Sequence, residues 1–321
     1  MSLEKIDVSV CMLTYFHEKY ISEAIESVLS QKTHFRFELV ISDDCSKDNT
    51  VSIIKEYENK YPDIIRVKIN ETNIGIPKNI YQARCMCRGR YIVLLSGDDY
   101  WIDDKKIEKE TSFLDSHSEY FSVFNCVELR IDDSKNAYEI RPHKRFRNKE
   151  YSIRDFEKGK ILASHGFMMR NEFLNEEGRE YFHKAQEISA YVDDAVDNVL
   201  ILKKGPVFVL NEITDAHRVI RKELNKNNYN SRYTRIEKFK HQIELYNELY
   251  NCFGNEIDFS WWFADSYSVG VLGMVASRDF SGYKEIFKTI PSEYRRLTTK
   301  SIYVRLVPNI FRHIVSRIKN R

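Results

Sequence analysis

Strand-like and helix-like runs alternate through the first hundred residues, and this alternation most limits the possible folds. Four short apolar runs, typical of buried strands, lie at residues 8–15, 36–42, 64–69 and 91–96. Between them apolar residues recur at helical spacing, and Pro77 suits the first turn of the third helix. This order predicts a mostly parallel sheet with helices on both faces, as in Rossmann-like α/β proteins.

The pattern changes after residue 104. A helix is predicted at 105–117, a strand at 120–130, a polar loop at 130–160, a short apolar segment at 161–170, a helix at 192–204 and a strand at 206–212. Long helical patterns then fill 233–253 and 261–277. We therefore predict an α/β domain at residues 1–225, with a nucleotide-binding half at 1–120 and an acceptor half at 121–225. Residues 226–321 are expected to form a helical C-terminal region.

Composition fits a soluble globular protein. The 321 residues are 42% hydrophobic and 31% charged, and no run approaches the ~20 apolar residues of a membrane-spanning helix. The N-terminus lacks the layout of a signal peptide. The six cysteines are scattered, which favours free thiols in a reducing cytoplasm over a disulfide framework.

Three acidic pairs follow or precede these elements: Asp43-Asp44, Asp98-Asp99 and Asp193-Asp194. The carboxyl ends of parallel strands are where open α/β sheets bind ligands. Carboxylates there can hold a divalent cation, bind ribose hydroxyls or act as a base. The alternative is that each pair only caps a helix or turn, which is the interpretation we favour for Asp43.

The first strand–helix turn, LTYFHEKY, contains no Gly-rich phosphate-binding motif. This argues against a dinucleotide-binding dehydrogenase and against a P-loop NTPase. If phosphates bind, a metal ion has to neutralise much of their charge. The turn Ser96-Gly97-Asp98-Asp99 is the candidate, because Mg²⁺ or Mn²⁺ uses one or two carboxylates together with substrate phosphate oxygens.

Three stretches together resemble the family 2 inverting glycosyltransferases of the GT-A fold, of the bacterial polysaccharide-biosynthesis type. They are VSVCMLTYFHEKYISEAIESVLSQ, FELVISDDCSKDNT and NETNIGIPKNIYQARCMCRGRYIVLLSGDDYW. The resemblance is close over residues 6–120 and looser to about 220. It implies a nucleoside-diphosphate sugar donor, a divalent metal, and transfer with inversion to a hydroxyl of a glycan or lipid-linked acceptor.

The resemblance also implies roles for individual residues. Residues of the nucleotide site would be Thr14, Tyr15, Glu18, Asp44, Asn73, Asn79 and Asp98. Asp99 would hold the metal, and Asp98 either the metal or the ribose; Ser96 stands where many relatives have a further Asp. A carboxylate at Asp44 can accept from the imide N–H of uracil or thymine. Tyr15 is alternatively a core aromatic, and Asn73 and Asn79 are alternatively parts of a structural turn.

The third acidic pair supplies the base. Family members carry an acidic pair at the start of a helix that runs into a Lys/Gly turn and a strand, so Asp194 is assigned as the base and Asp193 as its helper. The alternative is that both only cap the helix. His165, and His217-Arg218 after the last strand, are weaker candidates for contacts with the acceptor, the diphosphate or the metal.

Two other functions remain open from the sequence: a sugar-phosphate nucleotidyltransferase and a non-catalytic nucleotide-sugar-binding protein. The chain end is distinctive, with eight cations and no acid after Tyr294. A helix opened by Pro308 would carry an apolar stripe through Ile310, Ile314 and Ile318. Such a basic amphipathic helix predicts a cytoplasmic enzyme that lies peripherally at an anionic membrane, and no nucleic-acid partner is expected.

Overall fold

The computed structural model describes residues 5–131, 137–163, 166–188, 194–219, 233–277 and 283–295. The chain divides into two compact units. The first comprises Met1–Ile153 and Ile161–Arg221, and the second comprises Arg154–Lys160 and Lys222–Arg321. The predicted functional division at residue 225 stays a prediction. The candidate site residues named above that the structure describes all belong to the first unit.

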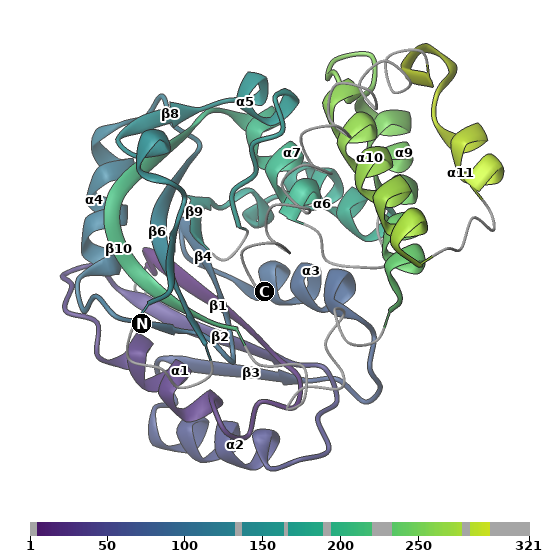
Figure 1. Cartoon of the computed structure of the whole chain (residues 1–321). Helices are drawn as coiled ribbons and strands as arrows, with labels where there is room; N and C mark the ends of the chain where they lie inside the picture. Colours follow the sequence, from purple (N-terminus) through teal and green to yellow (C-terminus); the bar gives the residue numbers. More distant parts are fainter. Residues whose placement is uncertain are drawn as a thin grey trace. The chain divides into compact units, whose positions relative to one another are not determined.

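The first half of this unit has the predicted alternation (Figure 1). Its strands are β1 (Val8–Thr14), β2 (Phe37–Asp43), β3 (Ile65–Ile69) and β4 (Tyr91–Ser96). The helices between them are α1 (Ile21–Leu29), α2 (Thr50–Lys60) and α3 (Ile76–Met86), the last with Pro77 in its first turn. The four strands are parallel in the order β3-β2-β1-β4, so their carboxyl ends share one edge.

The second half extends the same sheet to the order β3-β2-β1-β4-β9-β6-β10-β5. The added strands are β9 (Phe167–Arg170), β6 (Ser122–Ile131), β10 (Val207–Val219) and β5 (Tyr100–Trp101), with β7 (Glu139–Arg141) on β6 and β8 (Lys149–Tyr151) on β10. Each of the parallel ladders pairs five residues or more, whereas each antiparallel ladder pairs three or fewer. The sheet is therefore mixed and mostly parallel, as expected.

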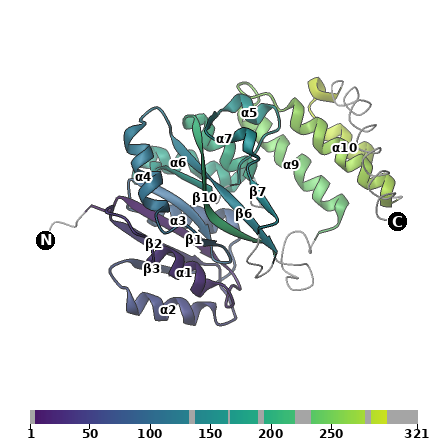
Figure 2. The ribbon, with the colours of Figure 1, turned by 60° about the vertical axis from the view of Figure 1, so that its left-hand side comes forward.

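Helices cover both faces of the parallel strands (Figures 1 and 2). Alternate residues of β1, such as Val10 and Met12, join one apolar core with residues of α1, α2 and α4 (Lys106–Ser116). On the other face α3 packs on β1 and β2 and contacts α6 (Glu176–Ile188), which in turn packs on α7 (Asp194–Lys204). Because successive side chains of a strand point to opposite faces of the sheet, each strand contacts the helices on both faces.

Three predictions about the second half need correction. The last strand does not end at residue 212 but continues through Val219, so His217 and Arg218 lie within β10 and not after it. Register shifts after Val209 and Ile213 interrupt the alternation that would have revealed this continuation. The polar stretch 130–160 contains β7, β8 and α5 (Ile153–Glu157), and α6 was not predicted.

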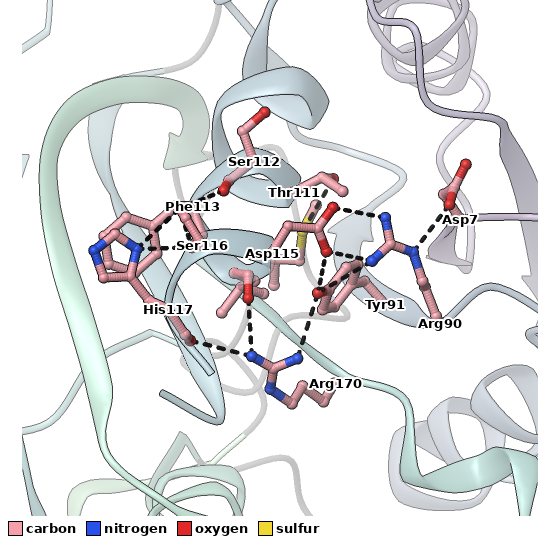
Figure 3. A network of polar contacts seen from close by, with 12 residues as sticks. Asp7, Arg90, Tyr91, Thr111, Ser112, Phe113, Asp115, Ser116, His117 and Arg170 are labelled. Carbon is pink, nitrogen blue, oxygen red and sulfur yellow. Dashed lines mark hydrogen bonds and ion pairs between the residues drawn. The ribbon is translucent and has the colours of Figure 1, made fainter. Parts of the chain in front are cut away.

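An ionic network lies at the amino ends of the parallel strands, opposite their carboxyl ends (Figure 3). The Arg90 guanidinium, at the start of β4, bonds Asp7 Oδ1 at 2.9 Å and forms a bidentate pair with the carboxylate of Asp115 from α4. Arg170 donates to the carbonyls of Leu114 and His117, which lie at the C-terminal end of α4 and need donors. Charged contacts therefore fix the amino ends of the strands.

The second unit is helical in the described residues, with α9 (Arg235–Phe253), α10 (Ser260–Ser277) and α11 (Tyr283–Thr289). A capping box between Thr234 and Glu237 begins α9. The indole N–H of Trp262 donates to the Phe156 carbonyl at 2.9 Å, which ties α10 to the segment 154–160. Among the described helices, none combines the length and apolar character needed to cross a membrane.

Candidate active site

The carboxyl end of β2 carries two acids with different surroundings. Asp43 accepts from the backbone N–H of Ser46 at 2.8 Å and from its hydroxyl at 2.5 Å. Burial raises the pKa of the Asp43 carboxyl, partly offset by these bonds. Asp43 is therefore a turn residue, as the sequence suggested.

Asp44 is buried and holds the turn that precedes α3. Its carboxylate accepts from the N–H groups of Ile74 and Gly75 at 2.8 and 3.0 Å and from Asn70 Nδ2 at 3.1 Å. Gly75 has φ +82°, a conformation that favours glycine. Because a carboxylate offers roughly four acceptor positions, three protein donors leave capacity for one donor of a ligand.

The two asparagines of the same stretch occupy different positions. Asn79 is buried, where its Oδ1 accepts from the Ser42 hydroxyl at 2.6 Å and from Asn70 Nδ2 at 3.0 Å, and its Nδ2 donates to the Ser42 carbonyl. These bonds give Asn79 a structural role between α3 and β2. Asn73 is exposed, and its contact with the nucleotide stays a prediction.

The turn after β1 is fixed by the start of α2. The N–H groups of Phe16 and His17 donate to the hydroxyls of Ser46 and Thr50, each at 2.9 Å. The carboxylate of Glu18 accepts from the Asn49 N–H at 2.9 Å. Hydrogen bonds to side chains therefore fix the backbone of this turn. A phosphate-binding loop would instead contain glycines and leave its backbone N–H groups free for the phosphate.

Thr14 is the last residue of β1 and is buried, whereas Tyr15, which follows it, is exposed. Tyr15 is 37% exposed and meets Phe16 edge to face with ring centroids 4.5 Å apart, so it is not a core aromatic and its ring is available to a base. Thr14 is buried, and its hydroxyl has no hydrogen-bond partner among the described residues. A buried hydroxyl without a partner is costly, so Thr14 is a polar group prepared for a ligand or a water.

The turn Ser96–Asp99 lies directly against this β1 turn. The Gly97 N–H donates to the Leu13 carbonyl at 2.7 Å, and a Cβ at Gly97 would lie 2.9 Å from both Thr14 Cβ and His17 Nδ1. Only glycine allows so close an approach. The Asp99 N–H then donates to the Ser96 carbonyl at 3.0 Å, which closes the turn.

Asp98 faces His17 across this contact. Its Oδ1 accepts from the Ser96 hydroxyl at 2.5 Å, and its Oδ2 lies 3.8 Å from His17 Nε2. Burial would raise the pKa of the Asp98 carboxyl, but attraction to His17, the Ser96 bond and attraction to His217 together lower it. Asp98 is thus held as an anion.

Asp99 joins the turn to β10. It is 3% exposed, and its two oxygens accept from the Arg218 N–H at 2.9 Å and contact His217 Nδ1 at 2.8 Å. Burial would lower the pKa of His217, but Asp99, Asp98 and Asp194 raise it to about 9. The charges of Asp98, Asp99 and Asp194 therefore act on one imidazole.

Arg218 also contacts the turn Ser96–Asp99, through its guanidinium. Its guanidinium is buried between the rings of Tyr20 and Tyr100, 4.9 and 4.4 Å from their centroids. It donates to the Asp98 carbonyl at 2.6 Å and forms an ion pair with Glu23. These contacts make it a residue that positions the turn, and its contact with a diphosphate stays a prediction.

Asp194 is the first residue of α7, which two buried polar side chains hold. Asp197, one turn further on, forms a bidentate ion pair with Arg84 of α3. Asn198 bonds the Tyr151 hydroxyl, both backbone groups of Leu162 and the Asp194 carbonyl. The sequence analysis did not identify these residues or His17, because no local pattern marks them. Asp193 and His165 lie outside the described residues.

Whether this edge can bind a divalent cation depends on the donor atoms that its side chains provide. Nowhere in the described ranges do three or more His, Cys, Asp or Glu side chains form a ready metal site. The carboxylates of Asp98 and Asp99 are oxygen donors of the kind that Mn²⁺ and Mg²⁺ accept. They fit a divalent ion whose remaining ligands come from substrate phosphates and water.

Comparisons with known proteins identify the family of this chain. The model of the family described as glycosyl transferase family 2 matches residues 9–178. An uncharacterized protein of Mycobacterium tuberculosis is 37% identical over 135 residues, which are 42% of this chain but only 39% of that relative. TuaG of Bacillus subtilis, a putative teichuronic acid biosynthesis glycosyltransferase, is 28% identical over 225 residues, 69% of this chain and 82% of TuaG.

Two solved structures share the fold. Staphylococcus aureus TarS in complex with UDP-GlcNAc superposes with a TM-score of 0.57 at 19% identity, covering 92% of this chain and 79% of that one. A Pyrobaculum calidifontis mannosyltransferase in complex with GDP-Man and Mn²⁺ gives 0.51 at 14% identity, covering 96% and 88%. Since the family match includes more than half of the 321 residues, this chain belongs to glycosyl transferase family 2.

Proposed function

We propose that the enzyme transfers a sugar from a UDP-sugar to a hydroxyl of a glycan or lipid-linked acceptor, with inversion and with the help of a divalent cation. The observation that carries this proposal is the contact of Asp99 with His217 at 2.8 Å in the turn that also holds Asp98, with the charge of Asp194 acting on the same imidazole. The three acids come from a strand end and from a helix start that are far apart in the sequence. A transferase needs both functions at one place: neutralisation of a leaving diphosphate and a base for the acceptor.

The donor base would lie between the β1 turn and the turn at 74–75. Tyr15 offers an exposed ring, and the remaining acceptor position of Asp44 suits the imide N–H of uracil. TarS, which has this fold, was solved with UDP-GlcNAc and with UDP, and this supports a uridine nucleotide.

The first prediction concerns the donor. Incubation with a panel of nucleotide sugars and Mn²⁺ should release a nucleoside diphosphate from a UDP-sugar or dTDP-sugar, since slow transfer to water needs no acceptor. Calorimetry should show tighter binding of UDP than of GDP or CDP, because cytosine lacks the imide N–H. Tighter binding of GDP than of UDP and dTDP would contradict the assignment of Asp44.

A divalent cation would be held by Asp99 and Asp98. When bound, such an ion neutralises the diphosphate and stabilises it as it leaves. The solved mannosyltransferase with Mn²⁺ supports the proposal. The turn after β1 lacks a Gly-rich loop whose backbone N–H groups could bind phosphates. Neutralisation of the diphosphate is therefore expected to need a cation.

The second prediction is that UDP binding and turnover require Mn²⁺ or Mg²⁺. Chelation should abolish turnover and weaken UDP binding, and the Asp99→Asn variant should behave alike, since an amide can still accept from the Arg218 N–H but carries no charge. Asp104→Asn is the matched control, because Asp104 is an exposed acid near the same loop that pairs with Lys32. Full UDP binding in excess chelator would show that the site works without metal.

The acid–base step would use Asp194. Its carboxylate takes the proton of the acceptor hydroxyl as that oxygen attacks the anomeric carbon. The bond from this carbon to the diphosphate oxygen breaks, and UDP leaves with the electron pair. Attack on the face opposite the leaving group inverts the configuration.

The third prediction tests this base. Asp194→Asn should keep the fold and UDP affinity while turnover, with water or with an acceptor, falls by ~10²-fold or more. Asp197→Asn is not a suitable control because its ion pair with Arg84 is buried, so Glu187→Gln serves instead, since Glu187 is exposed and its contact with His183 is also exposed. If Asp193→Asn is crippled and Asp194→Asn is near normal, the base is the neighbouring residue.

The fourth prediction concerns the basic tail, residues 300–321, which lies outside the described residues. Its sequence supports peripheral attachment at the cytoplasmic face of an anionic membrane. Truncation after Lys300 should leave donor hydrolysis intact and abolish pelleting with anionic vesicles, and pelleting of the full chain should weaken with salt. Equal pelleting of both proteins would show that the tail does not bind membranes.

A further inference from the structure

Arg84 and Asp197 form a buried ion pair between α3 and α7. Arg84 Nη1 and Nη2 lie 3.0 and 2.9 Å from the two oxygens of Asp197, so the guanidinium and the carboxylate meet side by side. The residues are only 4% and 7% exposed. Two parallel charge-assisted bonds fix both distance and orientation, which a single apolar contact does not do.

The pair connects the donor side of the candidate site to the proposed base. The turn at Ile74-Gly75, held by Asp44, leads directly into α3, and Arg84 lies two turns along that helix. Asp197 follows Asp194 by three residues, so the two lie on neighbouring positions of the same side of α7. Two rigid helices therefore link Asp44 to Asp194 through one ion pair.

The first turn of α7 is also fixed by hydrogen bonds of the buried Asn198. Asn198 Nδ2 donates to the carbonyl of Asp194 itself at 2.7 Å and to the Leu162 carbonyl at 2.7 Å, while its Oδ1 accepts from the Leu162 N–H. These bonds fix the backbone of the first turn of α7 against residue 162. They do not reach α3; α7 is joined to α3 directly by the Arg84–Asp197 pair and indirectly by packing through α6.

We propose that Arg84 and Asp197 are positioning residues that hold Asp194 at the distance from the donor required for attack on the anomeric carbon. The inference rests on the proposed function of Asp194 as the base. A displacement of about 1 Å in a reacting group costs up to ~10²-fold in rate, so the pair affects turnover more than binding.

The test is a double variant, Arg84→Met/Asp197→Leu. Removal of one partner alone would leave a buried charge and risk unfolding, whereas apolar replacement of both partners of a buried pair is commonly tolerated. The measured reaction is hydrolysis of the UDP-sugar with water as the acceptor, since attack by water needs the same base. We expect kcat to fall by roughly 10- to 100-fold, with the donor KM, the UDP affinity and the melting temperature close to those of the unchanged chain.

A second combination separates positioning from general loosening. When Asp194→Asn is added to the double variant, kcat should fall no lower than in Asp194→Asn alone, because the pair acts only through that carboxylate. The matched control is Arg90→Met/Asp115→Leu, which removes another bidentate Arg–Asp pair of the same unit at the opposite edge of the sheet (Figure 3). This control should retain the kcat of the unchanged chain.

Three outcomes overturn the inference. The first is normal kcat in the folded Arg84→Met/Asp197→Leu protein while Asp194→Asn is crippled; this leaves the proposed function intact. The second is a multiplicative loss when the changes are combined, which shows that the pair acts elsewhere. The third is normal activity of Asp194→Asn, which removes the proposed base and the positioning inference together.

Discussion

The bonds of the Asp99 carboxylate are the contacts on which the candidate site depends. One oxygen accepts from the Arg218 N–H and the other contacts His217, so the turn after β4 is fixed to β10 across the sheet. A buried carboxylate without these partners would be expensive. Together with the ladder to β6, the bonds to Asp99 keep β10 extended through residues whose sequence is polar, and they place His217 at the edge where β1, β2 and β4 end.

The charges at this edge are arranged alternately. His17 lies beside Asp98, His217 beside Asp99, and the Arg218 guanidinium beneath the turn is paired with Glu23. Because three acids raise the pKa of His217 to about 9, its imidazole is protonated at neutral pH in the free protein. The site thus balances its own carboxylates with cations, and these cations also suit a diphosphate that approaches the same edge.

Local pattern made some of this predictable. The period-two and period-3.6 runs gave the four parallel strands and their helices, and acids at strand ends predicted the edge that carries the site. Long-range pairings were not predictable, because nothing local distinguishes Arg84 from any other arginine of a helix, and its partner lies 113 positions away. The end of β10 was missed because Asp215 and His217 are polar, and only Lys106 and Asp99, distant in sequence, explain why such residues occupy a strand.

Buried ionic groups recur around the site and not only within it. Lys106 is fully buried and donates to Glu110 at 2.6 Å and to Asp215 at 2.9 Å, two residues before His217. One cation cannot neutralise two acids, and burial raises the pKa of Glu110 to about 7. Such clusters stabilise a fold less than apolar packing of the same volume would. What they add is direction: an ammonium or guanidinium bonds its partners only in a defined geometry. The strand that carries His217 and the helix that carries Asp194 are each held in this way, so the cost in stability falls on the elements that position the residues of the candidate site.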